Sequence, residues 1–199
     1  MGDMNITKQV GAGAEITGID LNELTDNQFT AIQQAYSDHG LLFFRGQKLT
    51  EPGHIEFARR FGTINVNRFF AANPEYPEIA LVTKETDQEA NIGGGWHTDH
   101  TYDQAPAMGS ILVARELPET GGDTWFVSMY NAFDQLSDGL KTALRNLRAV
   151  HSAKHAFGTK ADHQNTRTGN RIGNAEAADV LIDPVHPVVI KHPLSGRAA

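Results

Sequence analysis

The sequence of 199 residues contains no cysteine. This absence excludes disulfide bonds, cysteine-ligated zinc, iron–sulfur clusters and thiol nucleophiles together. It also fits a reducing compartment, so we expect a cytoplasmic protein. Long apolar runs are absent as well, because the longest ones, such as residues 41–44, are far too short to span a bilayer. The first residues lack the pattern of a signal peptide, and we expect none.

Basic residues are outnumbered, with 17 Lys and Arg against 24 Asp and Glu and a net charge of −7. An acidic chain without a basic block is a poor candidate for binding nucleic acid. Hydrophobic residues make up 40% and charged residues 21%, as in ordinary globular domains. We therefore expect one domain over residues 1–199 that binds a small molecule rather than nucleic acid or a membrane. A homo-oligomer is compatible with this composition.

Glycine-rich turns separate short β-rich runs, and a few segments have helical spacing. Thr25 and Gln28 form a capping box, which predicts a helix that ends at Gly40. Thr50 and Ser137 predict the starts of two further helices. Strands are predicted at 41–44, 79–83, 109–115, 123–128 and 187–192. This order is typical of a mainly β, α+β domain, a sandwich or barrel flanked by helices.

The segment Trp96–His100 carries the candidate chemistry. In an extended backbone, residues two apart point to the same side, so His97 and Asp99 would converge. A neutral imidazole and a carboxylate are two of the three ligands of a facial triad that holds non-haem Fe(II). The glycines at 93–95 allow unusual backbone torsions just before the motif, and Tyr102 follows it with an aromatic ring.

Two other readings of the same residues stay open. The segment could be a polar loop with a satisfied histidine, because a His-x-acid spacing is common by chance. His97 and His100 could also ligate zinc from one helical face, as in a zinc hydrolase, although the preceding glycines disfavour a helix.

Several sequence blocks, taken in order, resemble the TauD/TfdA family of Fe(II)- and 2-oxoglutarate-dependent dioxygenases, which includes taurine dioxygenase. The blocks are Phe43–Gln47, Phe57–Gly62, Trp96–Asp99, Pro106–Leu112, Glu116–Thr124, and His186–Val189 with His192-Pro193. They span nearly the whole chain, and several blocks in the right order form a specific signal.

The resemblance implies a fold and a set of ligands. It implies a double-stranded β-helix, a cupin-like jelly roll with helices packed outside. It implies that His97 and Asp99 bind Fe(II) and that Thr124 donates a hydrogen bond to a carboxylate of 2-oxoglutarate. The expected activity is hydroxylation of a small organic substrate with O2, which releases succinate and CO2. No acid–base residue is needed for the key step.

The substrate-binding residues of the taurine enzyme are not carried over. Its sulfonate-binding His, Tyr and Asn positions fall on Asn67, Phe70 and Gly93. Each exchange removes a donor suited to an anion, and hydrogen bonds to charged groups are worth about 1.5–3 kcal/mol each. We predict that taurine is not the substrate. Asn67, Phe69, Phe70 and Tyr102 would form a more apolar pocket, and we expect Asn67, Phe70, Gly93 and Tyr102 to bind substrate.

Members of this family continue beyond the segment that matches the last residues here. Their later segment carries the third iron ligand, a histidine, and an arginine that binds 2-oxoglutarate. We therefore expect this chain to be part of a longer enzyme whose barrel is incomplete here. In the alternative, another histidine replaces the third ligand, or the chain is a non-catalytic metal-binding jelly-roll remnant. The candidate histidines are His151, His155, His186 and His192. The polar segment 156–183 is a candidate lid.

Overall fold

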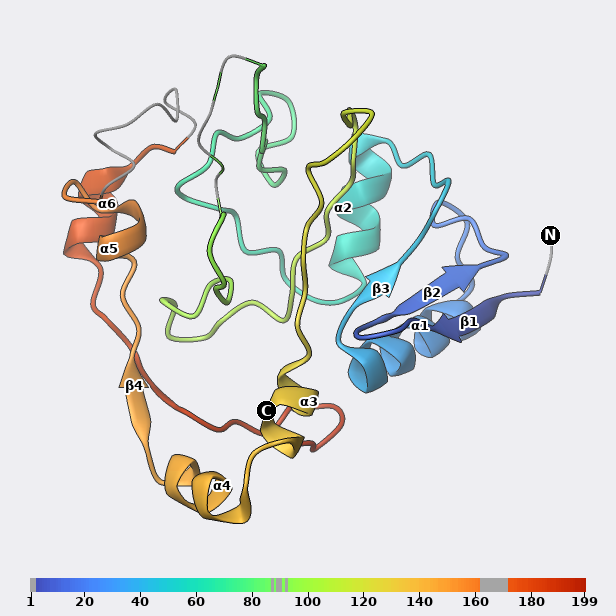
Figure 1. Cartoon of the computed structure of the whole chain (residues 1–199). Helices are drawn as coiled ribbons and strands as arrows, with labels where there is room; N and C mark the ends of the chain where they lie inside the picture. The colour runs from blue at the N-terminus through green and yellow to red at the C-terminus, as the bar shows by residue number, and fades with distance from the viewer. Residues whose placement is uncertain (1–2, 87, 89–90, 92, 162–171) are drawn as a thin grey trace. The chain divides into compact units, whose positions relative to one another are not determined.

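The computed structural model describes residues 3–86, 88, 91, 93–161 and 172–199 (Figure 1). The chain divides into two compact units, which are described separately. The first consists of Met1–Phe57, Leu112–Leu147 and Pro187–Ala199, and the second of Ala58–Ile111 and Arg148–His186. The expectations of a single domain and of a lid at 156–183 stay predictions, and residues 162–171 of that segment lie outside the described part.

A three-stranded sheet organises the first unit. Its strands are β1 (Asn5–Lys8), β2 (Ala14–Thr17) and β3 (Leu42–Phe43), in the order β1-β2-β3. β1 runs antiparallel to β2, whereas β3 pairs with β2 in parallel. The helix α1 (Asp26–His39) connects β2 to β3 and lies against the sheet (Figure 1).

The bounds of α1 follow from its caps. The Thr25 hydroxyl accepts a hydrogen bond from the Gln28 backbone N–H at 3.3 Å, and the Gln28 side-chain oxygen accepts one from the Thr25 N–H at 2.9 Å. Gly40 ends the helix with φ of 72°, a left-handed conformation that glycine adopts without strain. The predicted capping box and stop are both confirmed. One face of α1 is buried, through Phe29, Ile32 and Ala35.

Three more helices lie in or beside this unit: α2 (Glu51–Arg59), α3 (Met129–Asp134) and α4 (Asp138–Arg145). The predicted helix starts at Thr50 and Ser137 are confirmed, and the Ser137 hydroxyl accepts from the N–H of residue 140 at 3.3 Å. The short α3 was not predicted.

The second unit contains the two short helices α5 (Lys154–Phe157) and α6 (Ala175–Val180), which pack against each other. β4 (Arg148–Val150) pairs with β5 (Val185–Pro187) in a two-stranded sheet. The unit has its own hydrophobic core. The buried members are Phe69, Ala153 and Ala178, with Tyr102, Phe157, Ile172 and Leu181 packed against them.

Several predicted strands are wrong. The structure has no strand at 79–83, 109–115 or 123–128, all within its described part, and the predicted strand 187–192 is replaced by β5 and one isolated bridge. A β-rich segment becomes a strand only where a neighbour supplies hydrogen bonds, and propensity alone does not provide one. Accordingly, no barrel forms among the described residues. Apolar side chains in these segments are exposed: Leu112, Trp125, Phe126 and Val127.

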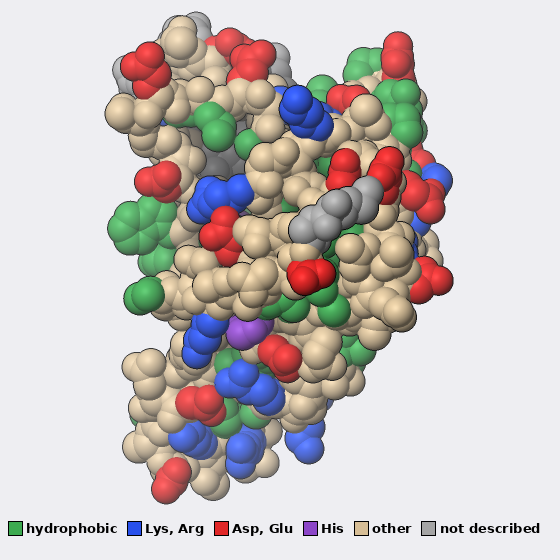
Figure 2. All heavy atoms as spheres, turned by 90° about the vertical axis from the view of Figure 1, so that its right-hand side faces the viewer, with side chains coloured by type: hydrophobic (Ala, Val, Ile, Leu, Met, Phe, Trp, Pro, Cys, Tyr) green, Lys and Arg blue, Asp and Glu red, His purple; other side chains and the backbone are tan. Residues whose placement is uncertain are grey.

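The surface carries charges of both signs. On the face drawn in Figure 2, acidic side chains lie among basic ones, so this face is not uniformly basic. Among the described residues, no helix has the length and apolar character needed to cross a bilayer.

Candidate metal centre

His97 and Asp99 converge in the second unit. The Nε2 atom of His97 lies 3.3 Å from the Oδ1 atom of Asp99. Their side chains are 57% and 60% exposed, so both remain accessible to a ligand. The convergence expected from the His-x-Asp spacing is therefore present. The segment 93–101 contains no helix, so His97 and His100 do not share the helical face that the zinc interpretation required.

A backbone carbonyl orients the ring of His97. The Nδ1 atom lies 2.8 Å from the carbonyl oxygen of Gly95, which can only accept a hydrogen bond. Nδ1 is therefore the donor of this hydrogen bond, and Nε2 is the ring nitrogen that faces Asp99. Metal-binding histidines usually donate a hydrogen bond of this kind from the ring nitrogen that does not bind the metal.

The pair fits a divalent metal ion. Nε2 and the carboxylate oxygen face each other at 3.3 Å, close enough for one ion to bind both atoms. An ion about 2.1 Å from each atom, a usual distance for His and Asp ligands, would subtend an angle of about 100°. That angle lies between the octahedral and tetrahedral values, and an imidazole nitrogen with a carboxylate oxygen is the donor pair found in facial-triad Fe(II) sites. The donor set therefore suits the group that the sequence predicts.

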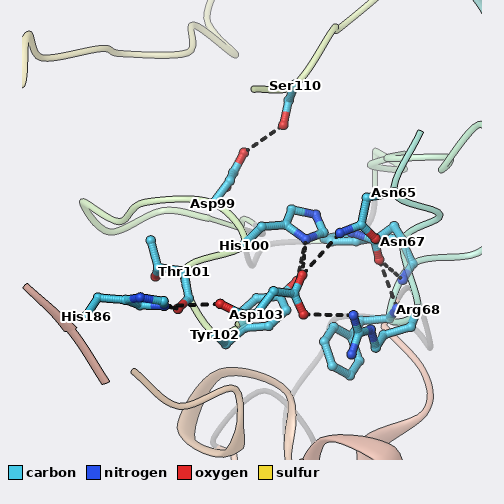
Figure 3. Close-up of polar contacts among 12 residues, drawn as sticks. Asn65, Asn67, Arg68, Asp99, His100, Thr101, Tyr102, Asp103, Ser110 and His186 are labelled. Atoms are coloured by element: carbon cyan, nitrogen blue, oxygen red, sulfur yellow. Dashed lines mark hydrogen bonds and ion pairs between the residues drawn. The ribbon is translucent and has the colours of Figure 1, made fainter. Parts of the chain in front are cut away.

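Ser110 holds the second oxygen of the same carboxylate. Its hydroxyl donates a hydrogen bond to Asp99 Oδ2 at 3.2 Å (Figure 3). Oδ1 is thereby left to face His97. Sequence reasoning did not assign Ser110 to the site, and its only signal was its place in the motif that ends at Leu112.

Gly93 leaves room for the His97 ring. A Cβ atom at this position would lie 3.1 Å from His97 Cε1 and 3.8 Å from Nε2, and the backbone has φ of 70°. We expect Gly93→Ala to displace the imidazole and to weaken binding of Mn(II) severalfold, because alanine adds both a close contact and left-handed strain. A titration of Mn(II) measures the change.

Gly94→Ala is the matched control for this prediction. A Cβ atom there would meet Asn91 at 3.6 Å, an ordinary contact, and the backbone does not have a positive φ. We expect this variant to bind Mn(II) like the unaltered protein. Equal binding by the Gly93 and Gly94 variants would contradict the role of Gly93 as a spacer. The predicted contact of Gly93 with substrate stays a prediction.

The other predicted substrate residues lie in the core or on its edge. The side-chain oxygen of Asn67 accepts hydrogen bonds from the backbone N–H groups of Phe69 and Phe70, at 2.9 and 3.0 Å. Asn67 thus shapes its own turn. Phe70 is half-buried, with its ring 6.3 Å from that of Phe157. Phe69 is 1% exposed, so the expectation that it lines a pocket is wrong: its ring is packed in the core.

Tyr102 is half-buried, with its ring 5.6 Å from that of Phe69. Burial, and next the negative charge of Asp103, raise the pKa of Tyr102 to about 12. Its phenol is therefore protonated at neutral pH. Its hydroxyl lies 3.5 Å from the Nδ1 atom of His100.

Asp103 collects several partners that sequence reasoning missed. Its carboxylate pairs with Arg68 at 2.8 Å and with the Nδ1 atom of His100 at 3.0 Å, and it accepts a hydrogen bond from Asn65 at 3.2 Å (Figure 3). The backbone of the same turn also contacts His186, whose Nε2 atom lies 3.1 Å from the Asp103 carbonyl oxygen. These contacts join residues that are far apart in sequence, so no local pattern predicts them.

The described residues supply no third ligand. No group of three His, Asp or Glu side chains that could hold an ion occurs among them. His186 directs Nε2 at two backbone carbonyls, and the Nδ1 atom of His192, in the first unit, accepts from the Ser195 N–H. Thr124 is exposed in an irregular segment of the first unit, and its predicted contact with 2-oxoglutarate stays a prediction.

Comparison with known proteins shows the family of this chain. Residues 5–199 match the family described as "Taurine catabolism dioxygenase TauD, TfdA family". The chain therefore belongs to the TauD/TfdA family of dioxygenases. This confirms the family that the ordered sequence blocks indicated.

Individual relatives extend this result. The chain is 33% identical over 188 residues to the (S)-phenoxypropionate/alpha-ketoglutarate-dioxygenase of Sphingobium herbicidovorans, covering 93% of this chain and 65% of that protein. It is 32% identical to the alpha-ketoglutarate-dependent 2,4-dichlorophenoxyacetate dioxygenase of Cupriavidus pinatubonensis, covering 92% of this chain and 67% of that one. The chain thus spans about two thirds of their length.

A solved structure also shares the fold. The crystal structure of a taurine dioxygenase from Burkholderia xenovorans aligns with a TM-score of 0.71 at 24% identity. The alignment covers 98% of this chain and 62% of that one. At this identity the likeness concerns the fold alone.

Proposed function

We propose that this chain forms the metal-binding part of an Fe(II)- and 2-oxoglutarate-dependent dioxygenase that hydroxylates a small organic substrate. The observation that carries the proposal is the pair of His97 Nε2 and Asp99 Oδ1, 3.3 Å apart in an N/O donor set that fits such an ion. Fe(II) with 2-oxoglutarate and O2 supplies the oxidation: one oxygen atom enters a C–H bond, and the other enters succinate as CO2 leaves.

The protein's own residues bind and orient these groups. His97 and Asp99 would hold the ion, with the Gly95 carbonyl and the Ser110 hydroxyl fixing their orientations. Thr124 would donate a hydrogen bond to a carboxylate of 2-oxoglutarate, as the family motif implies. The jelly roll implied by the family and the cytoplasmic location belong to the same proposal.

The substrate is proposed to have an apolar body, with taurine excluded. Phe70 and Tyr102 are half-buried aromatic side chains of the unit that holds the proposed ligands, and Asn67 commits its side-chain oxygen to two backbone N–H groups. The two relatives named for aryloxyalkanoates make that class the first to test. An aryl ring would pack against aromatic side chains, whereas a small sulfonate would find no donors in their place.

Succinate formation is the test of this proposal. The protein is supplied with Fe(II), 2-oxoglutarate and O2, and with phenoxypropionate, 2,4-dichlorophenoxyacetate or taurine in turn. We expect at least one aryloxyalkanoate to raise succinate formation, and taurine to leave it at the level without substrate. Succinate at the level of a His97→Ala variant with every substrate would contradict the proposed activity. Substantial turnover of taurine would contradict the proposed substrate class.

A non-catalytic metal-binding protein is the second candidate. It is favoured by one observation: the described residues place no third His, Asp or Glu side chain beside His97 and Asp99. Binding of Mn(II) without any formation of succinate would support this candidate over the dioxygenase.

A further inference from the structure

A polar network holds the turn that follows Asp99. The side chain of Asp103 is 11% exposed and pairs at once with Arg68, His100 and Asn65. Figure 3 shows Asp103 between the side chains of Arg68 and His100, with Asn65 on the same side as His100. Both carboxylate oxygens are therefore engaged, by two groups from segment 65–68 and one from its own turn. Such a charge-assisted network is rigid because each partner restrains the others.

The backbone of this turn is strained at one residue. His100, directly after Asp99, has φ of 56°, a left-handed conformation that non-glycine residues adopt at a cost in free energy. Such conformations persist when the surroundings fix them. The fixing contacts here are on the side chain: the His100 ring is 13% exposed, its Nδ1 atom is 3.0 Å from Asp103, and Tyr102 packs against it at 5.4 Å. The strained backbone of His100 and the side-chain contacts that hold it therefore lie in the same turn.

The chain reversal at His100 lies one residue beyond a proposed ligand. A left-handed residue at this point sets the direction in which the chain leaves Asp99, and with it the place to which the downstream segment returns. That segment carries Ser110, whose hydroxyl donates to Asp99 Oδ2 at 3.2 Å and leaves Oδ1 facing His97. An anchor that keeps His100 left-handed thereby helps Ser110 to hold the Asp99 carboxylate in this orientation.

We propose that Asp103 is a positioning residue for the metal centre. Its carboxylate holds His100 in the left-handed conformation and, through Arg68 and Asn65, ties the metal-ligating turn to the segment that begins the candidate substrate region. Asp103 does not touch the ion. This inference rests on the proposed function, because it concerns the geometry of the same two ligands.

The test is a double-variant cycle read out by metal binding. Asp103→Asn preserves the shape of the side chain and removes the charge that pairs with Arg68. Mn(II) bound by each variant is measured from the electron paramagnetic resonance of the free ion. We expect Asp103→Asn to weaken Mn(II) binding about tenfold, as changes around metal ligands commonly do. Glycine adopts a positive φ without an anchor, so the same change made in a His100→Gly protein should alter the affinity by less than about twofold.

A control variant separates positioning from general stability. Glu78→Gln removes another ion pair of the second unit, the one with Arg59 at 3.2 Å, and should leave Mn(II) affinity unchanged. Unchanged affinity in Asp103→Asn would overturn the proposal, even if the melting temperature fell. An equal loss in the His100→Gly background would also overturn it. Absence of Mn(II) binding by the unaltered protein would instead contradict the proposed function, and this inference with it.

Discussion

His97→Ala is expected to weaken Mn(II) binding more than about a hundredfold, since even changes around metal ligands cost about 10–100-fold. The variant removes the nitrogen that faces Asp99 Oδ1 at 3.3 Å and leaves a single carboxylate on an exposed turn. Asp99→Ala should act similarly, because the imidazole alone then remains. Titration of the free Mn(II) signal measures both, and succinate formation should fall to background in each.

His155→Ala is the control for this prediction. His155 is exposed on α5 and belongs to no group of potential ligands among the described residues. Its removal should leave Mn(II) affinity unchanged. If His97→Ala bound Mn(II) as tightly as the unaltered protein, the metal centre would lie elsewhere. If His155→Ala lost binding, the ligand set would have to include α5.

Phe69→Ala is expected to have the largest effect on stability. Phe69 is 1% exposed, stacks on Phe157 with ring centroids 4.3 Å apart, and also contacts Tyr102. Removing such a ring leaves a cavity, at a cost of about 3–5 kcal/mol of unfolding free energy. For a domain of this size, the melting temperature should fall by roughly 6–20 °C. Thermal unfolding followed by circular dichroism measures the change.

Trp125→Ala is the matched aromatic control. Its side chain is 77% exposed, so truncation should change the unfolding free energy by less than about 0.5 kcal/mol. Equal losses in the two variants would mean that the ring of Phe69 is not a core element. If Phe69→Ala lowers the unfolding free energy but keeps most of the Mn(II) affinity, the metal centre does not depend on this core ring.

The elements that sequence could predict are those with local causes. The helix after Thr25 was found because its capping box and its stop at Gly40 are encoded within sixteen residues. The predicted strands at 109–115 and 123–128 are wrong because a strand depends on a partner segment, and the described residues provide none there. Composition marked these segments as suited to a sheet, and suitability does not supply the missing hydrogen bonds.

The candidate site likewise contains residues that local spacing could predict and contacts between distant residues that it could not. His97 and Asp99 were found because two residues at spacing i, i+2 meet through local geometry. The contact of Ser110 with Asp99 spans eleven residues, and that of Arg68 with Asp103 spans thirty-five, so neither could be read from a local pattern. Asn67 illustrates a different limit, since its residue type suggested contact with substrate whereas its oxygen accepts from its own turn.

The chain has two tryptophans, and their exposure gives it two built-in optical reporters. Trp96 and Trp125 are 71% and 77% exposed, so their emission should resemble that of indole in water and be quenched readily by dissolved acrylamide. Each is adjacent in sequence to a residue with a proposed binding role: Trp96 to the metal ligand His97, and Trp125 to Thr124, which is proposed to bind 2-oxoglutarate. A paramagnetic ion bound at His97 would quench the fluorescence of Trp96. In a Trp125→Phe protein, the intrinsic tryptophan fluorescence would therefore report metal binding without an added label.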